Sequence, residues 1–132
     1  MLLLHHMTPV KVTIVEDELS ILRMYKTKLE IEGFSVSTAS RGSEGLKIIR
    51  THQPDIVLLD LRMPGMNGDE MLAKLRAEDW GAAVPVVILT NVSRDEAPSS
   101  LRFLGVSRYI VKAHCTPKQL VETIHLVLAS MR

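Results

Sequence analysis

Short apolar runs alternate with helical patterns along most of the chain. Five runs rich in β-branched and aliphatic residues predict strands, at residues 10–15, 34–39, 55–60, 85–90 and 108–112. The third run, DIVLLD, is almost continuously apolar, which is typical of a central strand covered on both faces. The segments between and after the runs predict five helices, at residues 18–32, 43–51 and 69–80, within 94–104, and from 116 onward.

The helical patterns differ in strength. Two of the helices have a clear apolar stripe, which holds Leu19, Leu22, Tyr25 and Leu29 in the first and Leu120, Ile124, Val127, Leu128 and Met131 in the last. The pattern within residues 94–104 is weak. Pro98 would interrupt a helix that began at Arg94, because proline lacks the backbone N–H of an interior helical position. That helix should begin near Pro98 or be short.

The alternation of strands and helices predicts the fold class. Strands joined through helices by short connections form right-handed βαβ crossovers, which produce an open parallel sheet with helices on both faces. We therefore expect an α/β fold with five strands and five helices. Residues 10–132 show no internal repeat or linker and should form one domain. Residues 1–9 are interpreted as a leader, an alternative start upstream of Met7 or a remnant of cloning.

Composition narrows the classes of function. The 132 residues are 46% hydrophobic and carry a net charge of +1, which gives no bulk electrostatic attraction to nucleic acid or to acidic membranes. The apolar runs fall far short of the ~20 residues that cross a bilayer. The single cysteine, Cys115, cannot form an internal disulfide and is interpreted as a structural thiol. These features predict a cytoplasmic protein that binds neither nucleic acid nor membrane directly.

Polar side chains follow four of the predicted strands. In an open parallel sheet, sites lie beyond the carboxyl ends of the strands. The residues at those ends are Glu16, Asp17 and Glu18 after the first strand, Asp60 after the third, Thr90 after the fourth and Lys112 after the fifth. We therefore expect several carboxylates, a hydroxyl and an ammonium to meet at one edge of the sheet.

That set of groups suits metal-assisted phosphoryl chemistry. Crowded carboxylates either hold protons or bind a cation, and Mg²⁺ prefers oxygen ligands such as those of Glu16, Asp17 and Asp60. A carboxylate beside a metal can also attack phosphorus, and Asp60, after the central strand, is best placed to do so. Lys112 and Thr90 would then bind the phosphoryl oxygens.

Each residue alone has a simpler interpretation. Acidic residues after the first strand suit the first turn of a helix, and Asp60 could begin a turn. Thr90 could end a strand by propensity, and Lys112 could be an exposed edge lysine. Their coincidence at the ends of separate strands favours a shared site.

Four segments, in order along the chain, carry a resemblance to a known family. They are VEDE at 15–18, DIVLLDLRMPGMNG at 55–68, VVILT at 86–90 and YIVK at 109–112. In these segments, and over roughly residues 10–131, the chain resembles the receiver domains of two-component response regulators. The resemblance implies a flavodoxin-like sheet with the strand order 2-1-3-4-5.

The resemblance also implies the acceptor and the metal ligands. Asp60 would accept a phosphoryl group from a sensor histidine kinase or a histidine phosphotransfer protein. Asp17 and Asp60 would bind Mg²⁺ through their side chains and Arg62 through its backbone carbonyl. Glu16 would support the ion through water. The domain would catalyse only its own phosphorylation and dephosphorylation, so it would not be an enzyme acting on other substrates.

The remaining implied roles concern switching. Lys112 would pair with a phosphoryl oxygen, while Thr90 and Tyr109 would form the switch. The altered face would comprise the helix within 94–104, the strand at 108–112 and the helix from 116. A downstream effector protein or a fused output domain would bind that face. No output segment follows the last helix, so the chain is either a stand-alone receiver or a piece of a longer regulator.

Two other functions share this type of sheet. A phosphatase with an aspartyl nucleophile places a general acid two residues after the nucleophile, where this chain has Arg62. A flavin-binding electron carrier needs a phosphate loop rich in hydroxyls and glycine after the first strand, where Glu16, Asp17 and Glu18 would repel anions. Both are therefore disfavoured.

One position departs from the family pattern. Ala113 follows Lys112, where the family usually has proline with a cis bond. A cis bond before a residue other than proline costs about 2.5–4 kcal/mol. We expect either a trans bond with a shifted loop or a strained cis bond that keeps the lysine in place.

Overall fold

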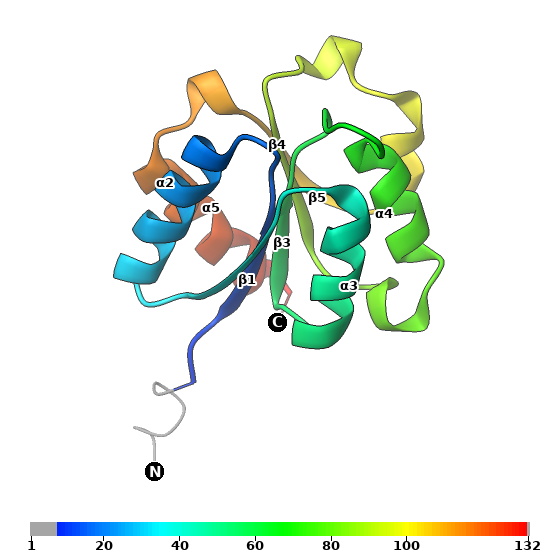
Figure 1. Ribbon diagram of the computed structural model, residues 1–132. Helices are drawn as coiled ribbons and strands as arrows, with labels where there is room; N and C mark the ends of the chain where they lie inside the picture. The colour runs from blue at the N-terminus through cyan, green and yellow to red at the C-terminus, as the bar shows by residue number, and fades with distance from the viewer. Residues whose placement is uncertain (1–7, 132) are drawn as a thin grey trace.

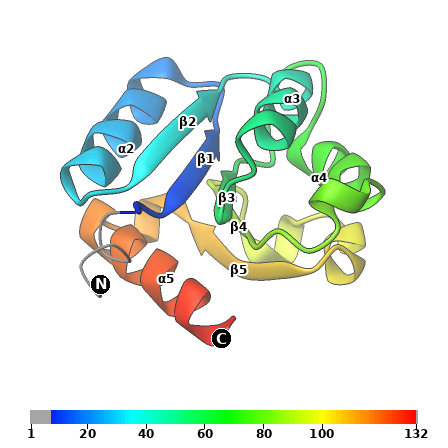
Figure 2. The ribbon, with the colours of Figure 1, turned by 90° about the horizontal axis from the view of Figure 1, so that it is seen from below.

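The computed structural model describes residues 8–131, so that most of the predicted leader lies outside the described residues (Figure 1). One parallel sheet holds five strands: β1 (Lys11–Val15), β2 (Ser35–Ala39), β3 (Ile56–Leu59), β4 (Val86–Thr90) and β5 (Val106–Val111). Their order is β2-β1-β3-β4-β5, which confirms the expected topology (Figure 2). The direction of winding changes between the adjacent strands β1 and β3, and ligands of such sheets bind at that point.

Within residues 8–131, four α-helices cover the two faces of the sheet. Helices α2 (Leu19–Ile31) and α5 (Pro117–Ser130) lie on one face, and α3 (Gly42–His52) and α4 (Gly68–Arg76) lie on the other (Figures 1 and 2). Successive strand residues point to opposite faces. Leu58 therefore packs in the core beneath α2 and α5, whereas Leu59 packs beneath α3 and α4. Burial on both sides explains the continuous apolar run of β3.

The expectation of five α-helices is wrong by one. Between β4 and β5 the described chain forms two short 3₁₀ helices, η2 (Arg94–Glu96) and η3 (Ser99–Phe103), in place of the α-helix predicted within residues 94–104. Ala97 separates them in an extended conformation, with φ −66° and ψ 146°. This follows from Pro98, because the residue before a proline is disfavoured in the α region.

Most of the two predicted apolar stripes is buried. Leu22, Tyr25 and Leu29 lie in the core, as do Leu120, Ile124 and Val127. Leu19 is 53% exposed and Met131 is 58% exposed, which corrects the expectation at both stripe ends. Leu19 is the first residue of α2, where a side chain tilts past the helix end. Met131 follows the last residue of α5.

Arg76, the last residue of α4, joins several segments near the amino ends of β4 and β5. Its guanidinium donates to four backbone carbonyls: those of Leu104 at 2.7 Å, Val84 at 2.7 Å, Gly81 at 3.0 Å and Gly105 at 3.0 Å. Gly81 ends a 3₁₀ turn, η1 (Asp79–Gly81), and the other three residues lie outside helices and strands, so one half-buried side chain satisfies carbonyls at the ends of several segments. Within residues 8–131, none of the helices has the length and apolar character needed to span a bilayer.

Candidate functional site

Two acidic residues follow the carboxyl ends of β1 and β3, and the backbone N–H of each is bonded to the adjacent strand. The Asp60 N–H donates to the Val15 carbonyl at 3.1 Å, and the Glu16 N–H donates to the Ala39 carbonyl at 3.0 Å. Both residues are therefore fixed by the neighbouring strand, although neither belongs to a strand itself. Asp17 follows Glu16 at the same edge of the sheet.

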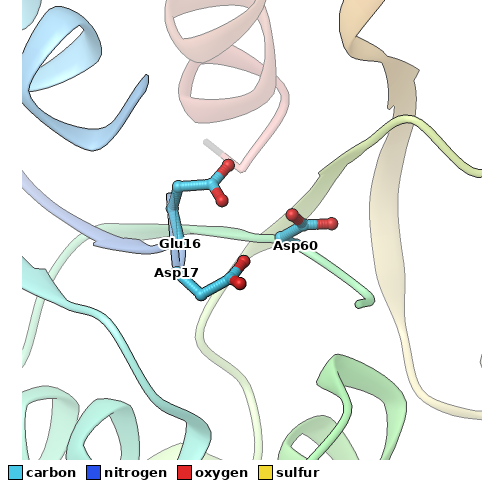
Figure 3. Close-up of side chains that lie close together, drawn as sticks. All are labelled: Glu16, Asp17 and Asp60. Carbon is cyan, nitrogen blue, oxygen red and sulfur yellow. The ribbon is translucent and has the colours of Figure 1, made fainter. Parts of the chain in front are cut away.

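Three carboxylates meet at this edge. Glu16, Asp17 and Asp60 each offer an oxygen, and these oxygens lie within 4.8 Å of one another. Figure 3 shows the side chains of Glu16 and Asp17 extending toward the side on which Asp60 lies. Glu16 is 3% exposed and Asp60 is 7% exposed, while Asp17 is half-buried. Clustered carboxylate oxygens are the donor set that a hard divalent cation prefers, so these residues fit Mg²⁺.

Lys112 follows β5 and bridges two of the carboxylates. Its Nζ donates to Asp60 Oδ2 at 2.9 Å and also to Glu16 Oε1. Burial alone would lower the pKa of Lys112, but the hydrogen bonds and charges of Glu16 and Asp60 outweigh it and the pKa is raised. Burial raises the pKa of Glu16, and the bond to Lys112 offsets this only in part. The ammonium therefore stays charged beside Asp60.

The other oxygen of Asp60 is held by the loop that follows it. The Arg62 N–H donates to Asp60 Oδ1 at 3.3 Å, so the two carboxylate oxygens have different partners. The same loop returns to the segment after Asp60 at Gly68, the first residue of α4, whose N–H donates to the Leu61 carbonyl at 2.8 Å. A Cβ at Gly68 would lie 2.1 Å from the Asp60 carbonyl oxygen. Sequence reasoning did not single out Gly68, although a glycine at a helix start was the available signal.

Asp60 is nearly buried but reaches solvent through a pocket. The pocket has a volume of about 440 Å³ and is lined by Asp17, Asp60, Arg62, Thr90 and Lys112 among others. Thr90 ends β4, is 1% exposed, and accepts a hydrogen bond at its Oγ1 from the Val92 N–H at 3.4 Å. Thr90, Lys112 and the carboxylates of Asp17 and Asp60 therefore line one open cavity, and Glu16 lies outside its lining.

Tyr109, on β5, contacts the loop after β4 that lines this pocket. Its hydroxyl donates to the Val92 carbonyl at 2.7 Å. The guanidinium of Arg94 lies over the ring, 5.7 Å from its centroid. Burial raises the pKa of the Tyr109 phenol, and the nearby charge of Arg94 opposes the rise without cancelling it. The contact with Arg94 was not foreseen, because no pattern in the sequence relates the loop after β4 to the face of β5.

The expectation for the bond after Lys112 is settled. Every peptide bond within residues 8–131 is trans, including the one between Lys112 and Ala113, so the cis alternative is wrong. A 3₁₀ turn, η4 (Lys112–His114), begins at the lysine. Burial raises the pKa of the Cys115 thiol, which packs against the core beneath α2 and α5. This agrees with its interpretation as a structural thiol.

Comparison with known proteins identifies the family. Residues 12–125 match the sequence model of the response regulator receiver domain. The chain belongs to this family. The receiver domain is a signalling module, and two-component regulators use it to connect kinases to output functions.

Individual relatives and solved structures agree. The chain is 37% identical over 118 residues to a probable transcriptional regulator, ycf27, of Porphyridium aerugineum, covering 89% of this chain and 48% of that protein. It is 34% identical over 110 residues to the phosphate regulon transcriptional regulatory protein PhoB of Rhizobium meliloti, covering 82% and 48%. This receiver chain thus spans about half the length of the curated relatives it matches.

Two solved structures are matched over almost their whole length. The chemotaxis protein CheY4 of Vibrio cholerae superposes with a TM-score of 0.84 at 28% identity, covering 91% of this chain and 99% of that one. A CheY-like receiver domain protein of Methanospirillum hungatei gives a TM-score of 0.85 at 28% identity, covering 93% and 96%.

Proposed function

We propose that Asp60 is the phosphoacceptor of this receiver domain and that its phosphorylation requires Mg²⁺. The observation that carries the proposal is the position of the Asp60 carboxylate. It lies at the floor of an open pocket, bonded to Lys112 at 2.9 Å and close to the carboxylates of Glu16 and Asp17. A nucleophile, a fixed cation and an acidic metal site within one cavity are the parts that phosphoryl transfer to a carboxylate needs.

The transfer step follows from this geometry. One Asp60 oxygen attacks the phosphorus of a phosphohistidine on a sensor kinase or a phosphotransfer protein. The O–P bond forms, the N–P bond breaks, and the imidazole nitrogen leaves with the electron pair. Lys112 and the hydroxyl of Thr90 would bind the phosphoryl oxygens, whose charge is close to two negative units. Water later attacks the acyl phosphate, restoring Asp60 and releasing inorganic phosphate.

The cation site is part of the proposal. Asp17 and Asp60 would hold Mg²⁺ through their side chains, Glu16 through water and Arg62 through its backbone carbonyl. When bound, the ion neutralises charge on the phosphoryl oxygens during transfer. Because the ion also balances three clustered carboxylates, its binding and the approach of an anionic donor favour each other.

Signal output would depend on Thr90 and Tyr109. A phosphoryl group on Asp60 attracts the Thr90 hydroxyl, and Tyr109 follows because its own hydroxyl is bonded to the loop after Thr90. The surface altered in this way comprises η2, η3, β5 and α5. An effector protein or a fused output domain would bind that surface. Phe103, which is 86% exposed in η3, contributes apolar area to it.

The wider assignment rests on the relatives. We propose that the receiver domain occupies residues 10–132 and acts in the cytoplasm, since a single cysteine suits a reducing compartment. Relatives described as transcriptional regulators are about twice as long as this chain. The chain would therefore regulate an output function carried by a partner or by a linked domain, without binding nucleic acid or membrane itself and without turning over other substrates.

The decisive experiment compares the parent chain with Asp60→Asn. Each is incubated with acetyl phosphate and Mg²⁺ and analysed by intact mass. The parent should gain the mass of one phosphoryl group, and a chelator should abolish the gain. Asp60→Asn should gain none. An unchanged mass in the parent would contradict the acceptor function, and labelling that persists in Asp60→Asn would place the acceptor at another residue.

A further inference from the structure

Arg94 makes two contacts with Tyr109 that phosphoryl transfer itself does not require. The guanidinium carbon lies 5.7 Å from the centroid of the Tyr109 ring. The Arg94 Nη2 also donates a hydrogen bond of 2.8 Å to the backbone carbonyl of Tyr109. The first contact restrains the ring and the second restrains the backbone of the same residue. Only a planar, multidentate cation can make both at once.

Tyr109 passes this restraint to the pocket wall. Its hydroxyl donates to the Val92 carbonyl at 2.7 Å, and the Val92 N–H donates to Thr90 Oγ1 at 3.4 Å. Val92 and Thr90 both line the pocket and both are buried. A continuous series of contacts therefore runs from Arg94 through Tyr109 and Val92 to Thr90.

The local backbone needs such an external contact. Arg94 begins η2, a single 3₁₀ turn of three residues, where the predicted α-helix did not form. A turn of this length has few internal hydrogen bonds and little stability of its own. The loop between Thr90 and Arg94 is thus held by its bonds to β5 rather than by a helix that follows it.

We propose that Arg94 is a positioning residue, which holds Tyr109 against the Val92 carbonyl and thereby keeps the Thr90 side of the pocket in place. The effect on the pocket rests on the proposed function, whereas the hold on Tyr109 does not. When the loop after Thr90 is already held in place, a phosphoryl group binds with a smaller entropic cost of ordering that loop. The phenol of Tyr109 is protonated at neutral pH, and burial raises its pKa further from the ordinary value of 10.0, so its hydroxyl remains a donor to Val92.

Fluorine NMR tests the hold on Tyr109 without any ligand. The chain has two tyrosines, so 3-fluorotyrosine gives two resonances, and Tyr109→Phe assigns them. In Arg94→Ala the Tyr109 resonance should move toward that of free fluorotyrosine while the Tyr25 resonance stays. Arg94→Lys should fall between, because it keeps the charge and loses the planar group. Arg102→Ala, an exposed arginine of η3, is the matched control and should move neither. A Tyr109 resonance that is unmoved in Arg94→Ala would overturn the proposal.

A binding measurement tests the effect on the pocket. Beryllium fluoride with Mg²⁺ serves as the phosphoryl analogue, and a thermal melt checks that each variant is folded. The affinity of Arg94→Ala should fall about two- to five-fold, as expected for the loss of an exposed cation–π contact, and that of Arg102→Ala should not change. Equal affinity in Arg94→Ala and the parent would overturn the positioning role. A parent chain that binds no analogue would instead contradict the proposed function, and the fluorine spectra would still decide whether Arg94 holds Tyr109.

Discussion

At the scale of single residues, the site carries more negative charge than its one lysine can balance. Three carboxylates lie within 4.8 Å of one another, and Lys112 bonds to two of them. Glu16 is the most buried of the three, with 3% of its surface exposed. Burial disfavours its charged form, so the folded state bears a cost at neutral pH that a bound cation would relieve.

This cost predicts a pH dependence. The pKa of Glu16 is raised above its ordinary value of 4.5 by burial, so the folded state holds the proton to higher pH than the unfolded state does. The stabilisation is complete below 4.5 and is lost as the pH rises through the raised pKa. In chelator, Glu16→Gln should match the parent at acidic pH and become the more stable chain as the pH rises to neutral. Urea unfolding at several pH values measures this.

The control for that series is Glu30→Gln, a neutral substitution at an exposed position of α2. Its stability should follow the parent across the same range, within about 0.5 kcal/mol. A difference between Glu16→Gln and the parent that stays constant with pH would show that Glu16 ionises equally in both states.

Individual residues also show which parts of the site the sequence predicts and which it does not. Asp60, Thr90 and Lys112 could be placed together because strand ends share an edge in a parallel sheet. The position of Tyr109 came from the family resemblance, since a tyrosine on a strand usually serves packing. Its contact with Arg94 depends on how an irregular loop folds back over β5, and periodicity does not encode that.

At the scale of elements, the strands follow directly from their apolar runs, while the segment after β4 does not. The weak pattern in residues 94–104 was compatible with a helix, but Pro98 forces Ala97 out of the α region. Leu101 still reaches the core beneath α3 and α4, so burial is achieved without an α-helix. The side chain of Leu101 is therefore buried although its backbone forms a 3₁₀ helix and not the expected α-helix.

The start of α4 gives a prediction at this scale. Helix propensity alone favours alanine over glycine by about 1 kcal/mol. At Gly68, however, a Cβ would lie 2.1 Å from the Asp60 carbonyl oxygen and 2.9 Å from the Leu61 Cα, both of which are backbone atoms. Gly68→Ala should therefore destabilise the fold by about 2 kcal/mol or more in urea unfolding, and should slow labelling of Asp60.

Gly42→Ala is the matched comparison for that variant. Gly42 begins α3, and the three nearest neighbours of its Cβ would be the Cβ and Sδ of Met66 at 3.1 Å and the Cγ at 3.2 Å. These side-chain contacts are about 1 Å longer than the backbone contact at Gly68, so this variant should cost less than Gly68→Ala. If Gly68→Ala were as stable as Gly42→Ala, the close approach of α4 to the Asp60 backbone would not limit that position.

At the scale of the whole molecule, cation binding should be visible as added stability. An ion that binds only the folded chain stabilises it by about 2.7 kcal/mol at a hundred-fold excess over Kd. Thermal unfolding should therefore shift upward by several degrees as Mg²⁺ is added. Asp17→Asn should lose most of that shift, because it removes one of the three carboxylates.

Asp95→Asn makes the same charge change at an exposed position of η2 and should keep the full response to Mg²⁺. If the two variants responded equally, the ion would be acting through general screening and not through the cluster at the sheet edge. A parent chain whose unfolding is insensitive to Mg²⁺ would contradict the metal site itself.

The four carbonyl bonds of Arg76 have a mechanical consequence for the whole molecule. They join the loops that precede β4 and β5, at the amino ends of those strands, while the pocket lies at the carboxyl ends. The amino ends of these strands are thus joined by four bonds from one side chain, whereas the carboxyl ends are joined by separate contacts of Arg94, Tyr109 and Lys112. We therefore expect a rearrangement near Asp60 to displace the carboxyl ends of β4 and β5, while the amino ends that Arg76 joins stay in place.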